Sequence, residues 1–390
     1  METVRIGIIG AGGMGGNHAR LLQNGEIKGA VLAGIADISP KVLDRWRDVG
    51  NCYDDASQMI RSGTVDAVII ATPHYPHTTY GIEALQAGLH TLVEKPISVH
   101  KADCERLIAA HTDKSKVFCA MFNQRTNGAY QKIRSLVQSG ELGRIQRIQW
   151  TITDWFRTDA YYAHGGWRAT WAGEGGGVLL NQCPHQLDLW QWMFGMPDRV
   201  RAFCHFGKYH DIEVEDEVTA YMEYDSGATG VFITTTGEAP GVNRLEVATD
   251  RGIIQIGGGA DGIQFKRNEI PTSQWISKAD ERFGKPPVWD VKVPTPPLSG
   301  GGHKTILQNF TDAITQGADL LAPAEEGIHS VELGNSMLLS AWENDQVTVP
   351  IDAKRFESLL KEKITGSRYD PEEAARKMRE SESADLKGSF

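Results

Sequence analysis

The sequence predicts an α/β protein in which a doubly wound parallel sheet is followed by an α+β unit with an open, mostly antiparallel sheet. Three observations predict this. Short apolar runs alternate with helical stretches over the first third of the chain, a glycine-rich turn follows the first run, and hairpin signals replace the alternation further on. Strands that alternate with helices form βαβ units and parallel sheets, whereas tight turns join antiparallel strands.

The first third contains β-branched apolar runs separated by stretches with helical periodicity. We expect the runs to form the parallel sheet and the stretches to form its right-handed crossover helices. The expected strands are 4–9, 30–36, 65–71, 90–93 and 117–121, and the expected helices are 14–24, 80–87 and 101–111.

Beyond residue 122, longer strands and tight turns replace this alternation. The turn Asp225-Ser226-Gly227 joins one expected hairpin, and residues 249–252 join another. The strands of the first hairpin are expected at 217–224 and 229–236, helices packed on the sheet at 181–194 and 304–315, a further helix at 326–342, and loops at 257–259, 286–297 and 300–302.

The composition is that of an ordinary globular protein with an excess of acidic residues. The chain has 390 residues, of which 41% are hydrophobic and 23% charged, and its formal net charge is -10. This balance disfavours nucleic acid and anionic membrane surfaces as partners, because both attract clustered Lys and Arg. The sequence shows no secretory leader pattern, no apolar run of about 18 residues, and no C-x-x-C spacing among its five cysteines. We therefore expect a cytoplasmic protein with reduced thiols and no membrane contact.

A G-x-G-x-x-G turn follows the first expected strand and opens the first expected helix. Its glycines are Gly10, Gly12 and Gly15, with Gly13 and Met14 between them. In this context the first glycine permits a tight turn, the second lets the backbone approach a pyrophosphate, and the third lets the helix pack on the strand. The motif predicts a Rossmann domain that binds a dinucleotide. The alternative is a glycine-rich turn without a ligand.

Asp37 follows the second expected strand, at about the 20-residue spacing where an acidic residue bonds the ribose hydroxyls. A carboxylate at this position repels the 2′-phosphate of NADP, and no Arg follows it directly. NAD is therefore the predicted cofactor. The alternative is a turn aspartate that caps Ser39-Pro40.

Three further motifs follow in order. They are Thr72-Pro73-His74-Tyr75-Pro76-His77, then Glu94-Lys95-Pro96, and then a triple glycine at 175–177 that leads through Asn181 to His185 and Asp188. With the glycine turn, this ordered set resembles the Gfo/Idh/MocA family of oxidoreductases over residues 4–351. The resemblance implies that residues 1–122 are an NAD-binding Rossmann domain and residues 123–365 a substrate-binding and oligomerisation domain. The charged segment 366–390 is left as a tail, which we expect to be a surface helix, a mobile end or a partner arm.

The resemblance also implies site positions. It places Lys95 between the nicotinamide and the substrate hydroxyl, next to Glu94 and before a cis peptide bond to Pro96. The other implied positions are Thr72, Pro73 and His77 along the nicotinamide half of the cofactor, Trp167 and Arg168 near cofactor and substrate, and His185 in the substrate pocket. In the family the antiparallel sheet often forms the oligomer interface, which implies a homodimer or homotetramer.

Asn181 departs from the family, where aspartate is frequent at this position. An amide can hydrogen-bond a hydroxyl but cannot take its proton, so a mechanism with a base at this position is not supported. The segment around Asn181 is similar to that of family members that oxidise glucosides at the 3-hydroxyl.

The implied reaction is the NAD-dependent oxidation of a secondary hydroxyl of a sugar, a glycoside or a cyclic polyol such as an inositol. The cofactor accepts the hydride, and the protein supplies a base within hydrogen-bond reach. Lys95 and His185 are the two candidates. Our hypothesis makes His185 the base and Lys95 the charge that stabilises the alkoxide, and the reverse assignment stays open. The structural alternatives are a solvated lysine before a proline, and a histidine satisfied by the backbone or by Asp188.

The aromatic-rich segment 150–194 and its neighbours supply candidate substrate contacts, because sugar rings stack on aromatic side chains while their hydroxyls bond polar groups. These candidates are Asn123, Arg125, Trp155, Arg157, Arg168, Asn181, Asp188 and His303. The alternative for any single ring is a core or interface position, and for Asp188 it is helix capping. No third ligand accompanies His74 and His77, so we expect no metal site.

Two other functions compete with this one. In the first, NAD is retained, and transient oxidation leads to elimination, epimerisation or transhydrogenation. In the second, the protein is a non-catalytic NAD or sugar sensor. The presence of both Lys95 and His185, without a basic DNA-binding helix, favours a catalyst.

Overall fold

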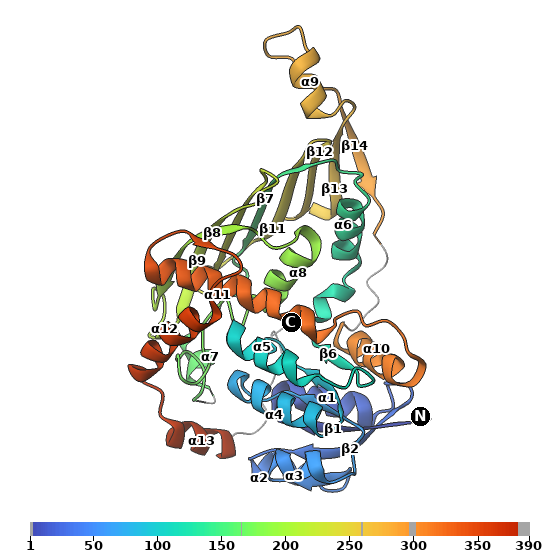
Figure 1. Ribbon diagram of the computed structural model, residues 1–390, viewed down its shortest axis with the longest axis vertical. Coiled ribbons are helices and arrows are strands. Elements are labelled where there is room, and N and C mark those ends of the chain that lie inside the picture. The colour runs from blue at the N-terminus through green and yellow to red at the C-terminus, as the bar shows by residue number, and fades with distance from the viewer. Residues whose placement is uncertain (1–2, 165, 259, 296–301, 381–390) are drawn as a thin grey trace.

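The computed structural model describes residues 3–164, 166–258, 260–295 and 302–380, and it contains two sheets that each carry helices (Figure 1). The chain first builds a six-stranded parallel sheet and then a nine-stranded, mostly antiparallel sheet. This confirms the predicted fold class.

The first sheet has the strand order β3-β2-β1-β4-β5-β6, with all neighbours parallel. Its strands are β1 (Val4–Ile9), β2 (Ala30–Ala36), β3 (Asn51–Tyr53), β4 (Ala67–Ile70), β5 (His90–Val93) and β6 (Phe118–Ala120). Its crossover helices are α1 (Gly13–Gln23), α2 (Pro40–Asp44), α3 (Ala56–Arg61), α4 (His74–Gln86) and α5 (Lys101–Ala110). The strand order reverses between β1 and β4, so the carboxyl ends of these strands form the crevice where doubly wound sheets bind ligands.

Helix α10 (Gly302–Gln316) packs in the core of the first sheet, although we expected the helix at 304–315 to lie on the second. Ile306, Leu307 and Phe310 are fully buried there. Gln308 fixes the helix to the first domain, since its side chain accepts from the amide of Lys28 and donates to the Lys28 carbonyl. Periodicity locates the apolar face of a helix but not the sheet that covers it, which is why the prediction of its packing was wrong.

The second sheet has the order β14-β13-β12-β11-β7-β10-β9-β8-β15, and its neighbours are antiparallel except for β7 and β10, which are parallel. Its strands are β7 (Ile145–Ile152), β8 (Arg199–Phe206), β9 (Glu215–Glu223), β10 (Thr229–Thr235), β11 (Asn243–Thr249), β12 (Gly252–Gly257), β13 (Ala260–Asn268), β14 (Val288–Val293) and β15 (Val347–Thr348). Both predicted hairpins are confirmed, as β9 with β10 and as β11 with β12.

The prediction of a loop at residues 286–297 was wrong, because part of this segment forms strand β14. Val288–Val293 pairs with β13 at the edge of the sheet. Edge strands tolerate flanking prolines, whose missing amides would interrupt a central strand. Residues 259, 296–297 and 300–301 of the expected loops lie outside the described residues, and Gly302 already belongs to α10.

The remaining helices are α6 (Gly128–Gln138), α7 (Asp159–Ala163), α8 (Pro184–Phe194), α9 (Thr272–Lys278), α11 (Gly327–Glu343), α12 (Ala353–Thr365), α13 (Pro371–Glu380) and the 3-10 turns Asn123–Thr126 and Ala324–Glu326. Helix α11 contacts α5 on one side and β8 and α8 on the other, so it lies between the two sheets (Figure 1). None of the described helices is both long and apolar enough to cross a membrane.

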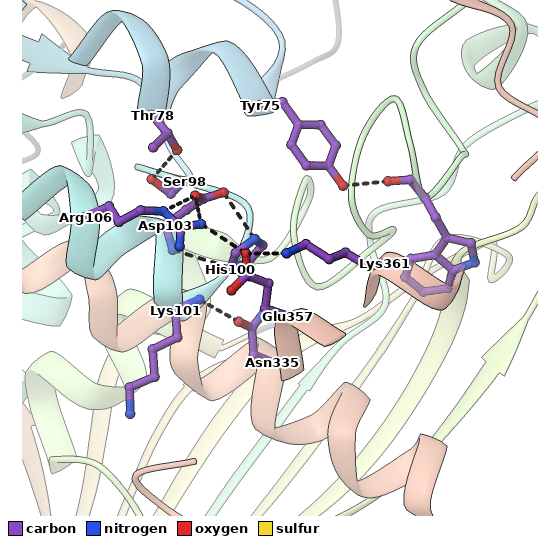
Figure 2. A network of polar contacts seen from close by, with 11 residues as sticks. Tyr75, Thr78, Ser98, His100, Lys101, Asp103, Arg106, Asn335, Glu357 and Lys361 are labelled. Atoms are coloured by element: carbon purple, nitrogen blue, oxygen red, sulfur yellow. Dashed lines mark hydrogen bonds and ion pairs between the residues drawn. The ribbon is translucent and has the colours of Figure 1, made fainter. Parts of the chain in front are cut away.

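A polar network joins α5 to α11 and α12 (Figure 2). The Lys101 ammonium donates to the Glu332 carboxylate at 2.6 Å, and the Lys101 amide donates to Asn335. Arg106 bonds Asp103 on its own helix and Glu357 on α12. The lysine and glutamate are buried, so their pairing offsets the cost of removing both charges from water and fixes the two domains to each other.

Candidate functional site

Of the three motif glycines Gly10, Gly12 and Gly15 in the turn after β1, only Gly12 has free space where a Cβ would lie. Gly10 has φ of +84°, and a Cβ there would lie 2.9 Å from the Ala71 carbonyl oxygen. A Cβ on Gly15 would lie 1.8 Å from the Gly10 carbonyl oxygen, so α1 packs directly on the turn. A Cβ on Gly12 would meet no heavy atom within 4 Å. The turn therefore offers its backbone to a phosphate at the N-terminus of α1.

A cavity of about 470 Å³ runs along the carboxyl ends of β1, β2, β4 and β5. It brings together many of the predicted positions. These are Gly10, Gly12, Gly13, Met14, Asp37, Thr72, Pro73, His77, Glu94, Lys95, Trp167, Arg168 and Asn181.

Both carboxylate oxygens of Asp37 accept backbone amides. Oδ2 accepts from Ala11 and Oδ1 from Ser39, each at 2.8 Å. Burial raises the pKa of Asp37, and the two amides oppose this shift. Each oxygen retains a second lone pair and Asp37 lines the cavity, so the turn contact and a ribose contact are compatible.

His77 links the two strand-end motifs. Its ring nitrogens face two carbonyl oxygens at 2.8 Å, Nδ1 that of Pro96 and Nε2 that of Thr72. His74 and His77 lie in the first turn of α4, where Pro76 is tolerated because the amides of a first turn have no partner within the helix. The Lys95–Pro96 peptide bond is cis, as the resemblance implied.

Glu94 lies under the cavity and is paired with His18, a residue that the sequence analysis missed. Nε2 of His18 and Oε1 of Glu94 are 2.8 Å apart, and both side chains are buried. Burial alone would raise the pKa of Glu94, but His18, His303 and Lys95 outweigh it and lower the pKa to about 2. A buried histidine on the core face of α1 was the available signal, because such a residue needs a partner.

Lys95 points from the end of β5 toward the second domain. Its ammonium donates to the backbone carbonyl of Asn181 at 2.8 Å. Burial lowers the pKa of Lys95, and Glu94 and Glu174 oppose that shift. The lysine thus joins the two domains at the cavity, and the carbonyl that holds it belongs to the triple-glycine segment.

His185 lies at the start of α8 within electrostatic range of Lys95. Burial lowers the pKa of His185 well below its usual value, and the charge of Lys95 lowers it further. Nδ1 of His185 is buried without a hydrogen-bond partner in the described part of the chain. The ring is therefore neutral near pH 7 and has a nitrogen available to a ligand.

Buried side-chain atoms without a hydrogen-bond partner are frequent among the predicted substrate-binding segments. Six of the eleven buried side-chain atoms that lack a hydrogen-bond partner within the described residues belong to the segments around residues 123, 155–168 and 185–186. They are Asn123 Oδ1, Trp155 Nε1, Arg157 Nε, Arg168 Nη1, His185 Nδ1 and Gln186 Oε1. Buried polar groups are normally satisfied, so this concentration indicates a site for a polar ligand.

Several of these side chains also contact one another. Arg157 and Arg168 both stack on Tyr161 of α7, with guanidinium-to-ring distances of 5.0 and 4.6 Å, and the sequence analysis did not single out this tyrosine. Asn123 Nδ2 lies 3.2 Å from Nδ1 of His303, which the structure places at the start of α10 as predicted.

Arg125 and Asp188, both predicted substrate contacts, bind each other. Their two hydrogen bonds measure 2.7 and 2.6 Å, and each side chain is 1% exposed. Neither residue lines the cavity. Their role is therefore structural. They form a bidentate ion pair that joins the 3-10 turn at Asn123–Thr126 to α8.

Helix α13 of the charged tail covers the Asp37 end of the cavity, which no motif signalled. Ser39 Oγ donates to the Arg379 carbonyl at 2.9 Å, Lys41 donates to the Glu380 carbonyl, and Met378 lines the cavity. Ala374 is buried beside Gly166. The tail thus packs as a surface helix over residues 371–380 (Figure 1), and residues 381–390 lie outside the described ranges.

These residues fit NAD. The open side of Gly12 would face the pyrophosphate, Asp37 the ribose of the adenosine half, and Thr72, Pro73 and His77 the nicotinamide half. Over the described residues, no three His, Cys, Asp or Glu side chains form a group that could hold a metal ion.

Comparisons with known proteins agree with this geometry. Residues 4–122 match the oxidoreductase family with an NAD-binding Rossmann fold, and residues 130–255 match the GFO/IDH/MocA C-terminal domain. The structure resembles that of the WlbA dehydrogenase from Bordetella pertussis in complex with NADH and UDP-GlcNAcA. That likeness has a TM-score of 0.75 and 26% identity, and it covers 90% of this chain and 100% of the other.

Two curated relatives are also similar. The myo-inositol 2-dehydrogenase of Thermotoga maritima is 26% identical over 262 residues, 64% of this chain and 74% of its own length. The levoglucosan dehydrogenase of Pseudarthrobacter phenanthrenivorans is 24% identical over 395 residues, 90% of this chain and 99% of its own length. Together with the glycine turn and the strand-end motifs, the matches to both domains establish that this chain belongs to the Gfo/Idh/MocA family of NAD-binding oxidoreductases.

Proposed function

We propose that this enzyme oxidises a secondary hydroxyl of a sugar, glycoside or cyclic polyol with NAD as hydride acceptor. The observation that carries the proposal is that Lys95 lines the cavity within electrostatic range of His185, whose buried Nδ1 lacks a hydrogen-bond partner among the described residues. The curated relatives named as inositol and levoglucosan dehydrogenases support the substrate class. Inositols and the C3 hydroxyl of glucosides are the first substrates to test.

The side chains divide the chemistry between them. Bound NAD supplies the hydride acceptor. His185 takes the hydroxyl proton on a ring nitrogen, and the Lys95 ammonium stabilises the negative charge that develops on the substrate oxygen. The Asn181 carbonyl and Glu94 hold Lys95 in place, since the first accepts from its ammonium and the second from its backbone amide.

Lys95→Ala should lower kcat by about 10² to 10³, because it removes the charge that faces the developing alkoxide. NADH formation gives the rate, and quenching of tryptophan fluorescence gives the dissociation constant of NAD. That constant should change little. Lys278→Ala on α9 is the matched control, since Lys278 is an exposed lysine outside the cavity lining. Full activity of Lys95→Ala would remove Lys95 from the mechanism.

The pH profile should identify the base. Burial and Lys95 lower the pKa of His185 below 6.5, so its proton-accepting form persists at neutral pH and is lost only as the pH falls through that lower value. If Lys95 were the base, kcat/KM would instead rise with pH toward a lysine pKa that burial holds below 10.5. We expect kcat/KM to be flat from pH 7 to 9. A tenfold rise per pH unit over that range would assign the base to Lys95.

A second candidate function keeps NAD bound through the catalytic cycle, and the contacts of α13 favour it. Removal of residues 371–390 should speed NADH release, measured by stopped-flow displacement, because it takes away Met378 and the contacts to Ser39 and Lys41. Glu372→Ala, on an exposed position of α13, should leave the release rate unchanged. Equal release rates for the truncated and full chains would mean that the tail does not retain the cofactor.

We also propose a homodimer or homotetramer formed through the uncovered face of the second sheet. Phe203 and Tyr221 are exposed on the neighbouring strands β8 and β9. The residues that alternate with them along each strand are buried in the core, as Ala202 and Ala220 are. Tyr221→Glu should shift the sedimentation coefficient toward that of a monomer, because it places charge in the contact. Phe283→Glu, at a 93% exposed position outside this face, is the control. A monomeric parent protein would contradict the proposal.

A further inference from the structure

Glu174 is a buried carboxylate directly behind the site, and the mechanism above does not use it. Its side chain is 2% exposed and does not line the cavity. Oε1 accepts a hydrogen bond from the Asn181 side-chain amide, and Oε2 accepts from the Ala169 backbone amide at 2.7 Å. One carboxylate therefore joins the Trp167-Arg168 loop to the residue that departs from the family pattern.

The charge state of Glu174 follows from its neighbours. Burial raises its pKa, while Arg168, the Ala169 amide, the Asn181 amide and Lys95 oppose the shift. The Arg168 guanidinium lies 3.6 Å from Oε1. With two donors and a cation beside it, the carboxylate acts as an acceptor on both oxygens.

This contact decides which way the Asn181 amide faces. A carboxylate only accepts, so Asn181 must present its nitrogen to Glu174 and turn its oxygen away. Asn181 lines the cavity, and its backbone carbonyl holds the Lys95 ammonium. The side-chain oxygen is thereby an acceptor for a substrate hydroxyl beside Lys95.

The loop that Glu174 holds is also conformationally constrained. Ala169 has φ of +64°, a left-handed conformation that is unfavourable for alanine, and its amide is the one that Glu174 binds. Trp167 and Arg168, which immediately precede it, line the cavity. The backbone amide cannot reverse its polarity, so whatever occupies position 174 must offer it an acceptor.

We propose that Glu174 is a positioning residue that fixes Asn181 as a hydrogen-bond acceptor for the substrate. This rests on the proposed dehydrogenase function and goes beyond it, since it specifies that the substrate donates a hydroxyl hydrogen to position 181. It also explains how this chain works without the aspartate that the family often has there. The Asn181 side-chain oxygen keeps the hydrogen-bond acceptor at this position, and the negative charge is carried by Glu174, which binds the Asn181 amide.

The proposal makes a specific prediction for Glu174→Gln. The introduced amide must turn its oxygen to the Ala169 amide, so its nitrogen faces Asn181 and forces the Asn181 amide to rotate. Position 181 then offers a donor where the substrate needs an acceptor. KM for the carbohydrate should rise about tenfold with kcat changed less, and the dissociation constant of NADH should not change.

The double variant Glu174→Gln with Asn181→Asp tests the polarity directly. It exchanges the amide and the carboxylate between the two positions, so the hydrogen bonds to Ala169 and between the two side chains are kept, and an acceptor again faces the substrate. KM should return to within about threefold of the parent value. Asn181→Asp alone should raise KM at neutral pH, because it places two carboxylates in contact.

Glu215→Gln is the matched control. Glu215 is another buried carboxylate under the triple-glycine segment, where it accepts from the amides of Gly177 and Leu179. Asn181→Asp should not restore any defect of Glu215→Gln. If Asn181→Asp fails to restore Glu174→Gln while both variants fold and bind NADH, the positioning role is wrong.

A readout without turnover separates this proposal from the proposed function. In the parent protein the Asn181 carboxamide should give a slowly exchanging side-chain ¹⁵N–¹H signal, assigned by its loss in Asn181→Asp. Glu174→Gln should speed that exchange, because the nitrogen then faces the cavity. Absence of any carbohydrate oxidation by the parent protein would contradict the proposed function. Unchanged exchange in Glu174→Gln would contradict the positioning role alone.

Discussion

The constraint on which the structure depends is that polar side chains buried between the two hydrophobic cores must find partners there. The two cores meet across α5, α11 and the strand-end turns, and charged groups lie within this junction. Lys101 pairs with Glu332, Arg125 with Asp188, and His18 with Glu94. Removing one partner of such a pair costs about 3–5 kcal/mol, because the other charge stays buried alone. The Lys101–Glu332 pair therefore helps to set the position of one domain on the other, whereas the other two pairs fix elements within a single domain.

The site lies where this pairing is incomplete. On the substrate side the unpaired atoms include a guanidinium nitrogen, an indole nitrogen and an amide oxygen, so the surface offers both donors and acceptors. A ligand with several hydroxyl groups satisfies such a surface, because each hydroxyl both donates and accepts. The stacked arrangement of Arg157 and Arg168 on Tyr161 keeps these donors in place before any ligand arrives, which lowers the entropy cost of binding.

The sequence alone predicted those parts of this site that local patterns encode. Gly10, Gly12, Asp37 and Lys95 each follow a strand of the parallel sheet, and the topology alone brings strand ends together. It did not reach His18 or Glu174, because their partners are distant in sequence or in a loop of irregular conformation. Arg125 and Asp188, in contrast, were predicted as substrate contacts but bind each other. Their residue types suit a sugar, but only the packing of α8 against the 3-10 turn reveals that they satisfy each other.

The turn after β2 couples the cofactor site to the tail. Asp37 accepts the Ser39 amide, and the Ser39 hydroxyl donates to the Arg379 carbonyl at the end of α13. The residue predicted to bind the ribose and the residue that bonds the tail are thus two positions apart and share a hydrogen bond. Any free energy by which the docked α13 strengthens NAD binding must, by linkage, equal the free energy by which bound NAD stabilises the docking of α13. The tail therefore borders the cavity, although no motif marks it and the family matches end well before it.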